Sequence, residues 1–88
     1  MLTPAALRHR IAELVVAACD GEVDVDQVLG AGSLVLIGVG SLASLRIIDA
    51  VETEFGMPLG IDDDPSFLDT VDGIADHLLG QGLQLESA

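Results

Sequence analysis

Residues 41–55 read SLASLRIIDAVETEF, and this segment decides the fold. Its apolar side chains recur every three or four positions, which places them on one face of an α-helix; they are Leu42, Leu45, Ile48, Val51 and Phe55. Ser41 opens the segment, and Gly56 followed by Pro58 closes it. We therefore predict a buried helix that begins at Ser41 and is ended by Gly56.

A second helix is predicted near the start of the chain, over residues 4–19. Thr3 is suited to capping its free N–H groups, and proline is tolerated at the first helical position, here Pro4. Asp20 and Gly21 end this helix. One face of it carries Leu7, Ile11, Leu14, Val15 and Ala18.

A third helix is predicted near the end of the chain, with Thr70 as its cap. The turn at residues 62–65 precedes a short helical piece that holds Phe67 and Leu68. The apolar face of the third helix carries Val71, Ile74, Ala75 and Leu78. We expect a single domain over residues 1–80 and a flexible tail over residues 81–88.

The segment between the first two helices, residues 22–40, has a mixed pattern. Glycine stands at positions 30, 32, 38 and 40. We predict a long loop with room for one helical turn near residues 26–29, and the alternative is a strand at residues 34–37. A loop this long in a small domain is usually functional or contains an unrecognised element.

Together these segments predict an all-α, up-and-down bundle of three main helices and one short helix. A chain of 88 residues supports one core, and half of its residues are apolar while only two are aromatic. The core is therefore expected to be aliphatic. The residues expected inside are Leu7, Ile11, Leu14, Leu45, Ile48, Val51, Phe55, Val71, Ile74 and Leu78.

Charge and cysteine content exclude several classes of function. The chain has 15 acidic residues, three arginines and no lysine, for a formal net charge of -12, so we expect no nucleic-acid partner. No apolar stretch approaches the roughly 20 residues that span a membrane, so no membrane association is expected. The lone Cys19 permits no internal disulfide and fits a cytoplasmic protein. The acids at residues 20–26 lack the spacing of a calcium loop, and we predict no metal site.

Ser41 is the candidate functional residue, because the stretch Gly38-Val39-Gly40-Ser41-Leu42 places a hydroxyl at the first turn of a helix behind two glycines. The free N–H groups and the helix dipole there favour an anion such as a phosphate ester. The alternative is that Ser41 serves only as the N-cap of the helix.

The sequence resembles the acyl carrier protein family from the first helix to Leu79. The resemblance is carried by Ile37 to Leu42, Leu45, Ile47, Ile48, Glu52, Glu54 to Gly56, Ile61, Asp62, Phe67, Thr70, Val71, Ile74 and Ala75. In that family a Leu-Gly-x-Asp-Ser-Leu frame contains the serine that receives 4'-phosphopantetheine. The resemblance assigns the attachment to Ser41, the leucine to Leu42 and the frame's glycine to Gly38, while Gly40 replaces the usual aspartate.

The family's function implies a monomeric carrier and not an enzyme. Its arm would hold an acyl or aminoacyl group as a thioester, in a specialised pathway of the polyketide or nonribosomal type. The expected partners are a phosphopantetheinyl transferase, a loading enzyme, and a ketosynthase or acyltransferase. They would contact Ala43, Arg46, Asp49 and Glu52 on the helix after Ser41, and we expect Arg46 to pair in part with Asp49.

Three other functions fit parts of the sequence. Residues 34–43 match a strand, a G-x-G-x-x-A motif and a helix, as in dinucleotide-binding proteins, although the remaining βα units are missing. A serine hydrolase would need His9 or His77 to activate Ser41, and we expect both histidines at the surface. An unmodified acidic protein-interaction module is the main alternative to the carrier.

Overall fold

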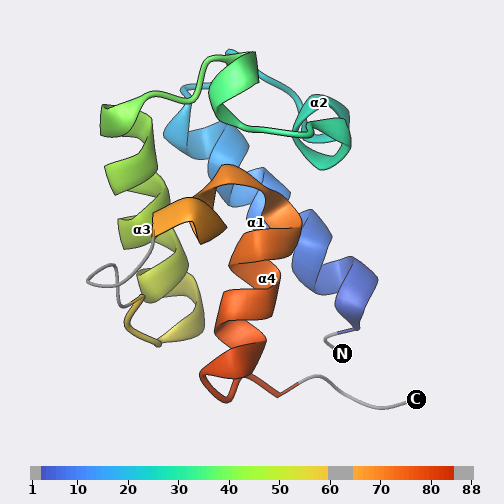
Figure 1. Ribbon diagram of the computed structural model, residues 1–88, viewed down its shortest axis with the longest axis vertical. Helices are drawn as coiled ribbons and strands as arrows, with labels where there is room; N and C mark the ends of the chain where they lie inside the picture. Colours follow the sequence, from blue (N-terminus) through green and yellow to red (C-terminus); the bar gives the residue numbers. More distant parts are fainter. Residues whose placement is uncertain (1–2, 60–64, 85–88) are drawn as a thin grey trace.

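The computed structural model describes residues 3–59 and 65–84, and Figure 1 shows how its helices are arranged. The four α-helices are α1 (Pro4–Ala18), α2 (Val25–Gly30), α3 (Ser41–Phe55) and α4 (Val71–Gly80). Two short 3₁₀ helices, η1 (Val35–Ile37) and η2 (Pro65–Asp69), precede α3 and α4. The described residues contain no strand and form a compact all-α domain.

The predicted caps and the helices that they begin are confirmed. The Thr3 hydroxyl accepts a hydrogen bond from the N–H of Ala6 at 3.1 Å, and the Thr70 hydroxyl accepts one from Gly73 at 2.9 Å. The helix predicted over residues 4–19 ends one residue earlier, because Cys19 is its C-cap. The predicted short helical piece is η2, while residues 62–64 of the turn before it lie outside the described residues.

The prediction of a long loop between the first two main helices is wrong in part. A single helical turn was predicted near residues 26–29, and the structure has the longer helix α2 there. This helix begins with a capping box between Asp24 and Gln27. The alternative of a strand at residues 34–37 is also wrong, because residues 35–37 form η1. Turns within this segment and Asp69 of η2 accept its backbone hydrogen bonds, so it needs no strand partner.

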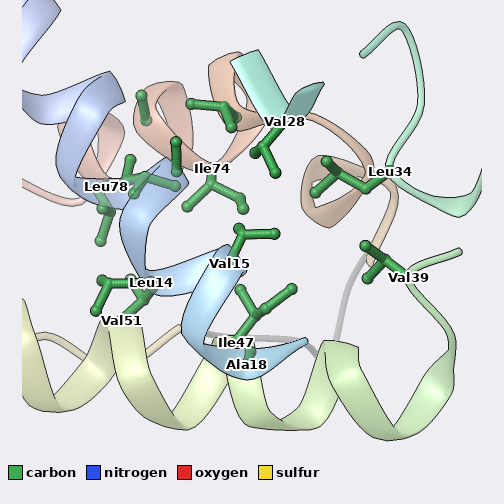
Figure 2. Close-up of a cluster of buried hydrophobic side chains, with 14 of the residues drawn as sticks. Leu14, Val15, Ala18, Val28, Leu34, Val39, Ile47, Val51, Ile74 and Leu78 are labelled. Carbon is green, nitrogen blue, oxygen red and sulfur yellow. The ribbon is translucent and has the colours of Figure 1, made fainter. Parts of the chain in front are cut away.

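The helices pack around α1, which contacts α2, α3 and α4, while η2 packs on α4 and crosses between α3 and α4 (Figure 1). The core is aliphatic, as expected. Figure 2 shows Ile47 and Val51 of α3 beside Leu14, Val15 and Ala18 of α1. The buried residues are Leu7, Ile11, Ala12, Leu14, Val15, Ala18, Val23, Val28, Leu34, Val39, Ile47, Val51, Leu59, Val71, Ile74, Ala75 and Leu78.

The predicted inner face of α3 is wrong for Leu42 and Leu45, which are 65% and 59% exposed. Ile48 and Phe55 are half-buried and pack against the core. Ile47, which was not predicted, is 1% exposed. The reason is that α3 carries apolar residues around much of its circumference, and α1 packs on the stripe that contains Ile47 and Val51, four positions apart.

Two ion pairs tie α1 to its neighbours. Arg10 Nε and one of its terminal nitrogens donate to the two carboxylate oxygens of Glu54 on α3, at 2.9 and 2.8 Å. Arg8 Nε lies 2.6 Å from Asp72 on α4. Both pairs join segments far apart in the sequence, so they help set how the helices lie relative to one another.

The Arg10–Glu54 pair predicts a pH-dependent stability. Hydrogen bonding from Arg10 lowers the pKa of Glu54 in the folded protein. A carboxyl with a lowered folded pKa stabilises the fold above its unfolded pKa, and the stabilisation disappears as the pH falls through the folded value. We expect Glu54→Gln to lower the Tm modestly at pH 7, and the gap from wild type to close as the pH falls below about 4.3.

Thermal melts followed by circular dichroism test this expectation. Glu22→Gln is the matched control, because Glu22 is exposed and no ion pair involves it in the described structure. A gap between Glu54→Gln and wild type that stayed constant down to pH 3 would contradict it.

Candidate functional site

Ser41 is the first residue of α3 and is exposed. The N-cap residue of α3 is Gly40, which has no side chain to cap the helix. The alternative that Ser41 serves only as the N-cap is therefore wrong. The first turn of a helix has N–H groups without intrahelical partners. The exposed Ser41 hydroxyl therefore stands beside donors that favour an anion.

The loop before α3 is held by two buried residues, Leu34 and Val39, which are 1% and 3% exposed. The N–H of Val39 donates to the carbonyl of Leu34 at 3.1 Å and closes the turn. Gly38 adopts φ +99° there, a left-handed conformation that costs other residues about 1–2 kcal/mol. The glycine of the predicted frame thus has a conformational role, and the turn delivers the chain to Ser41.

Asp69, the last residue of η2, fastens this loop to the C-terminal part of the domain. Its carboxylate oxygen Oδ1 accepts hydrogen bonds from the Ser33 hydroxyl at 2.8 Å and the N–H of Val35 at 3.3 Å. Its backbone carbonyl accepts the N–H of Leu34 at 2.7 Å. Three consecutive loop residues are therefore bound to one residue of η2. Sequence reasoning missed Asp69, because its partners lie more than 30 positions away.

Ser41 is one of the residues that line a pocket with a volume of about 920 Å³. Its walls come from the loop before α3, from one side of α3 and from η2. Leu45 and Ile48, which the sequence predicted inside the core, line this pocket, and Ile48 also packs against the core. The residues around it are Ser33, Leu34, Val35, Val39, Ser41, Ser44, Leu45, Ile48, Ser66, Leu68 and Asp69.

The surface around Ser41 is apolar. The exposed large hydrophobic residues of the described chain are Val35, Leu36, Leu42 and Leu45, which are 67%, 83%, 65% and 59% exposed. No acidic residue occurs at positions 27–48, although the chain has 15 of them. The acids of the protein therefore come from other parts of the sequence, and Leu42 is one of these four exposed apolar residues.

The four predicted partner-contact residues differ in their exposure and in their contacts within the protein. Asp49 is exposed and Ala43 is half-buried. Arg46 is exposed, but its guanidinium lies 3.3 Å from Asp20 and not beside Asp49, which corrects the expected pairing. Glu52 is half-buried and accepts a hydrogen bond from the N–H of Leu59 at 2.8 Å, so its carboxylate holds the chain that follows α3.

The two histidines do not line the pocket beside Ser41. His9 is exposed, and its Nε2 lies 3.9 Å from Glu13. His77 is half-buried, and its ring stacks on Phe67 with centroids 3.8 Å apart. A hydrolase that pairs Ser41 with histidine therefore has no support in the described residues. A dinucleotide site is likewise excluded there, because no strand precedes the glycines.

Cys19 is half-buried at the end of α1. Burial raises the pKa of its thiol, and the carboxylates of Glu22 and Asp20 raise it further. The thiol therefore stays protonated, which makes it a poor nucleophile.

No cluster of three potential metal ligands occurs among residues 3–59 and 65–84. Within the same residues, no helix has both the length and the hydrophobicity to span a membrane.

The uncapped start of α3 predicts that Gly40→Asp stabilises the protein. Gly40 has φ -91° and ψ -172°, which any residue adopts, and a Cβ there would contact nothing within 4 Å. Aspartate would add an N-cap, a favourable interaction with the helix dipole and a less flexible unfolded chain, together worth about 1 kcal/mol. We expect a Tm higher by about 4–8 °C. Gly40→Ala, which cannot cap, is the control, and an equal gain in both variants would contradict the capping explanation.

Comparison with protein-family models, with curated proteins and with solved structures found no match.

Proposed function

We propose that this protein is an acyl carrier protein that bears 4'-phosphopantetheine on Ser41. The observation that carries the proposal is the exposed hydroxyl of Ser41 at the first turn of α3, on the rim of a pocket. The sequence resemblance assigns the same serine. The order of elements also suits the up-and-down bundle that the family implies, with α1, α3 and α4 as its main helices.

The residues around Ser41 fit a phosphopantetheine group. Gly40 adds no side chain, and the N–H groups at the start of α3 favour the negative charge of a phosphodiester. On attachment, the Ser41 oxygen would form a bond to the β-phosphorus of coenzyme A and lose its proton, while the pyrophosphate bond breaks and releases adenosine 3',5'-bisphosphate. The bound group supplies a thiol that holds the load as a thioester.

The transferase and the later partners must approach the surface around Ser41. Leu42, with Val35, Leu36 and Leu45, offers them an apolar contact, while Ala43 and Asp49 lie on the same helix. Glu52 and Arg46 have internal partners, so we assign them first to holding α3 in place. The acids elsewhere would steer basic partners over a longer range.

The pocket beside Ser41 is suited to sheltering the load. An arm anchored on the rim can fold back between α3 and η2, where Leu34, Leu45, Ile48 and Leu68 provide apolar contacts. Aliphatic walls without large aromatic side chains adjust to loads of different shape. As a carrier, the protein would itself perform no catalysis, because its partner enzymes supply the chemistry. Gly40, in place of the family's usual aspartate, favours a dedicated pathway with its own partner enzymes, such as a ketosynthase or acyltransferase.

Intact-mass measurement tests the proposal. The purified protein is incubated with coenzyme A and a broad-specificity phosphopantetheinyl transferase. We expect one addition per chain with the mass of phosphopantetheine. A second incubation with a known carrier protein shows that the transferase is active.

The competing function is an unmodified protein-interaction module. Four exposed large apolar residues, Val35, Leu36, Leu42 and Leu45, favour it, because a docking partner could cover them. Folded protein that gains no mass while the known carrier is modified would support the module and reject the carrier.

A further inference from the structure

The lining of the pocket beside Ser41 is mostly apolar, but it includes polar side chains. Ser33, Ser44 and Asp69 line it together with Leu45 and Ile48. A pocket for a plain hydrocarbon chain would gain nothing from these groups, because burying hydroxyls and a carboxylate against hydrocarbon costs free energy. These polar side chains therefore suit a load that carries hydrogen-bonding groups of its own.

Asp69 gives this pocket a negative charge. It is the only ionisable residue among those that line the described pocket, and Arg46, the nearest arginine in the sequence, is not among them. Its Oδ1 atom is held by the Ser33 hydroxyl and the N–H of Val35, which fixes the orientation of the carboxylate. A carboxylate accepts up to about four hydrogen bonds, so these two leave capacity for a ligand. A preorganised acceptor loses little conformational entropy when a donor binds.

Three kinds of load would interact differently with Asp69. A neutral alkyl load would displace water from the carboxylate and return no hydrogen bond. A carboxylated load would be repelled by the like charge. A load with an ammonium group would form a charge-assisted hydrogen bond, which is about twice as strong as a neutral one. The net charge of -12 adds a general preference for a cation.

We propose that the load sheltered in this pocket is an aminoacyl group, whose α-ammonium group pairs with the carboxylate of Asp69. This inference rests on the carrier function of Ser41. It assigns Asp69 two roles: holding the loop before α3 and selecting a cationic load.

A pair of loads with the same carbon skeleton tests the inference. The transferase attaches the arm from two coenzyme A analogues, one with a leucyl and one with a 4-methylpentanoyl group, each joined through a stable amide. The two differ only in the ammonium group. We expect the leucyl form to melt about 4–8 °C higher. A third form carrying N-acetylleucine, which has no positive charge, should lose this advantage.

The Asp69→Asn variant distinguishes pairing of the ammonium group with Asp69 from its attraction to the net negative charge of the protein. Asparagine keeps an Oδ1 acceptor for Ser33 and Val35 but has no negative charge, so the leucyl advantage should disappear. Asp76→Asn removes the same charge from an exposed position of α4 outside the pocket and should preserve the advantage.

Three outcomes would overturn the aminoacyl assignment: equal melting of the leucyl and 4-methylpentanoyl forms, an advantage that survives acetylation, or one that survives in a folded Asp69→Asn variant. The comparison of loads on the wild-type protein decides the question even if that variant does not fold. No attachment of any arm to the wild-type protein would instead reject the carrier function itself.

Discussion

Ser41→Ala is expected to abolish the addition of phosphopantetheine completely, while the wild-type protein is modified once per chain. The hydroxyl oxygen of Ser41 is the atom that would form the new bond to phosphorus, and alanine has no atom to replace it. Because Ser41 is exposed at the first helical position and is not the N-cap, its loss should leave the fold intact. Intact mass gives the extent of addition, and circular dichroism shows that the variant is folded.

Thr53→Ala is the matched control for this experiment. Thr53 is an exposed hydroxyl residue on the same helix, and it does not line the pocket. We expect its modification to equal that of wild type. Addition to Ser41→Ala would place the attachment elsewhere, and a loss in both variants would show that the transferase responds to the helix and not to one hydroxyl.

Ile47→Ala is expected to destabilise the protein by about 2–5 kcal/mol, whereas Leu45→Ala should cost less than about 1 kcal/mol. Ile47 is 1% exposed against α1, so its truncation leaves a cavity, while Leu45 is 59% exposed on the rim of the pocket. The two residues lie two positions apart on the same helix. Urea denaturation gives both free energies of unfolding.

The stability of a domain this small is modest, and Ile47→Ala removes a large part of it. Ile47→Val is therefore the second variant, with an expected cost of about 0.5–1.5 kcal/mol. If Leu45→Ala proved as costly as Ile47→Ala, the packing of α3 described above would be wrong, and the face predicted from the sequence would be right.

The helices were predictable because their signals are local. Thr3 and Thr70 accept hydrogen bonds from N–H groups three residues ahead, and Gly56 ends α3 in a left-handed conformation. A cap needs only neighbouring residues to form, so its sequence pattern carries nearly all the information. The weaker elements α2 and η1 were predicted less well, since short helices depend on the core to hold residues such as Val28 and Leu34.

Of the candidate site, only Ser41 and its neighbours in the sequence were predictable. The glycines, Ser41 and Leu42 are contiguous in the chain and form one recognisable motif. Asp69 escaped prediction, and Glu52 was predicted as a partner contact and not as the acceptor for Leu59, because both roles depend on which part of the chain lies beside them. Arg46 was assigned to Asp49 from helical spacing, whereas its partner Asp20 belongs to the turn after α1.

The sequence by itself determined where the main helices begin and end and which serine stands at the start of α3, because hydrogen bonds between near neighbours decide both. Only the tertiary structure decided which stripe of α3 is buried. Apolar residues surround much of that helix, and their burial depends on where α1 packs. Packing of the stripe with Ile47 and Val51 against α1 leaves Leu45 and Ile48 to line the pocket, and Asp69 reaches its wall only because η2 folds back over the loop.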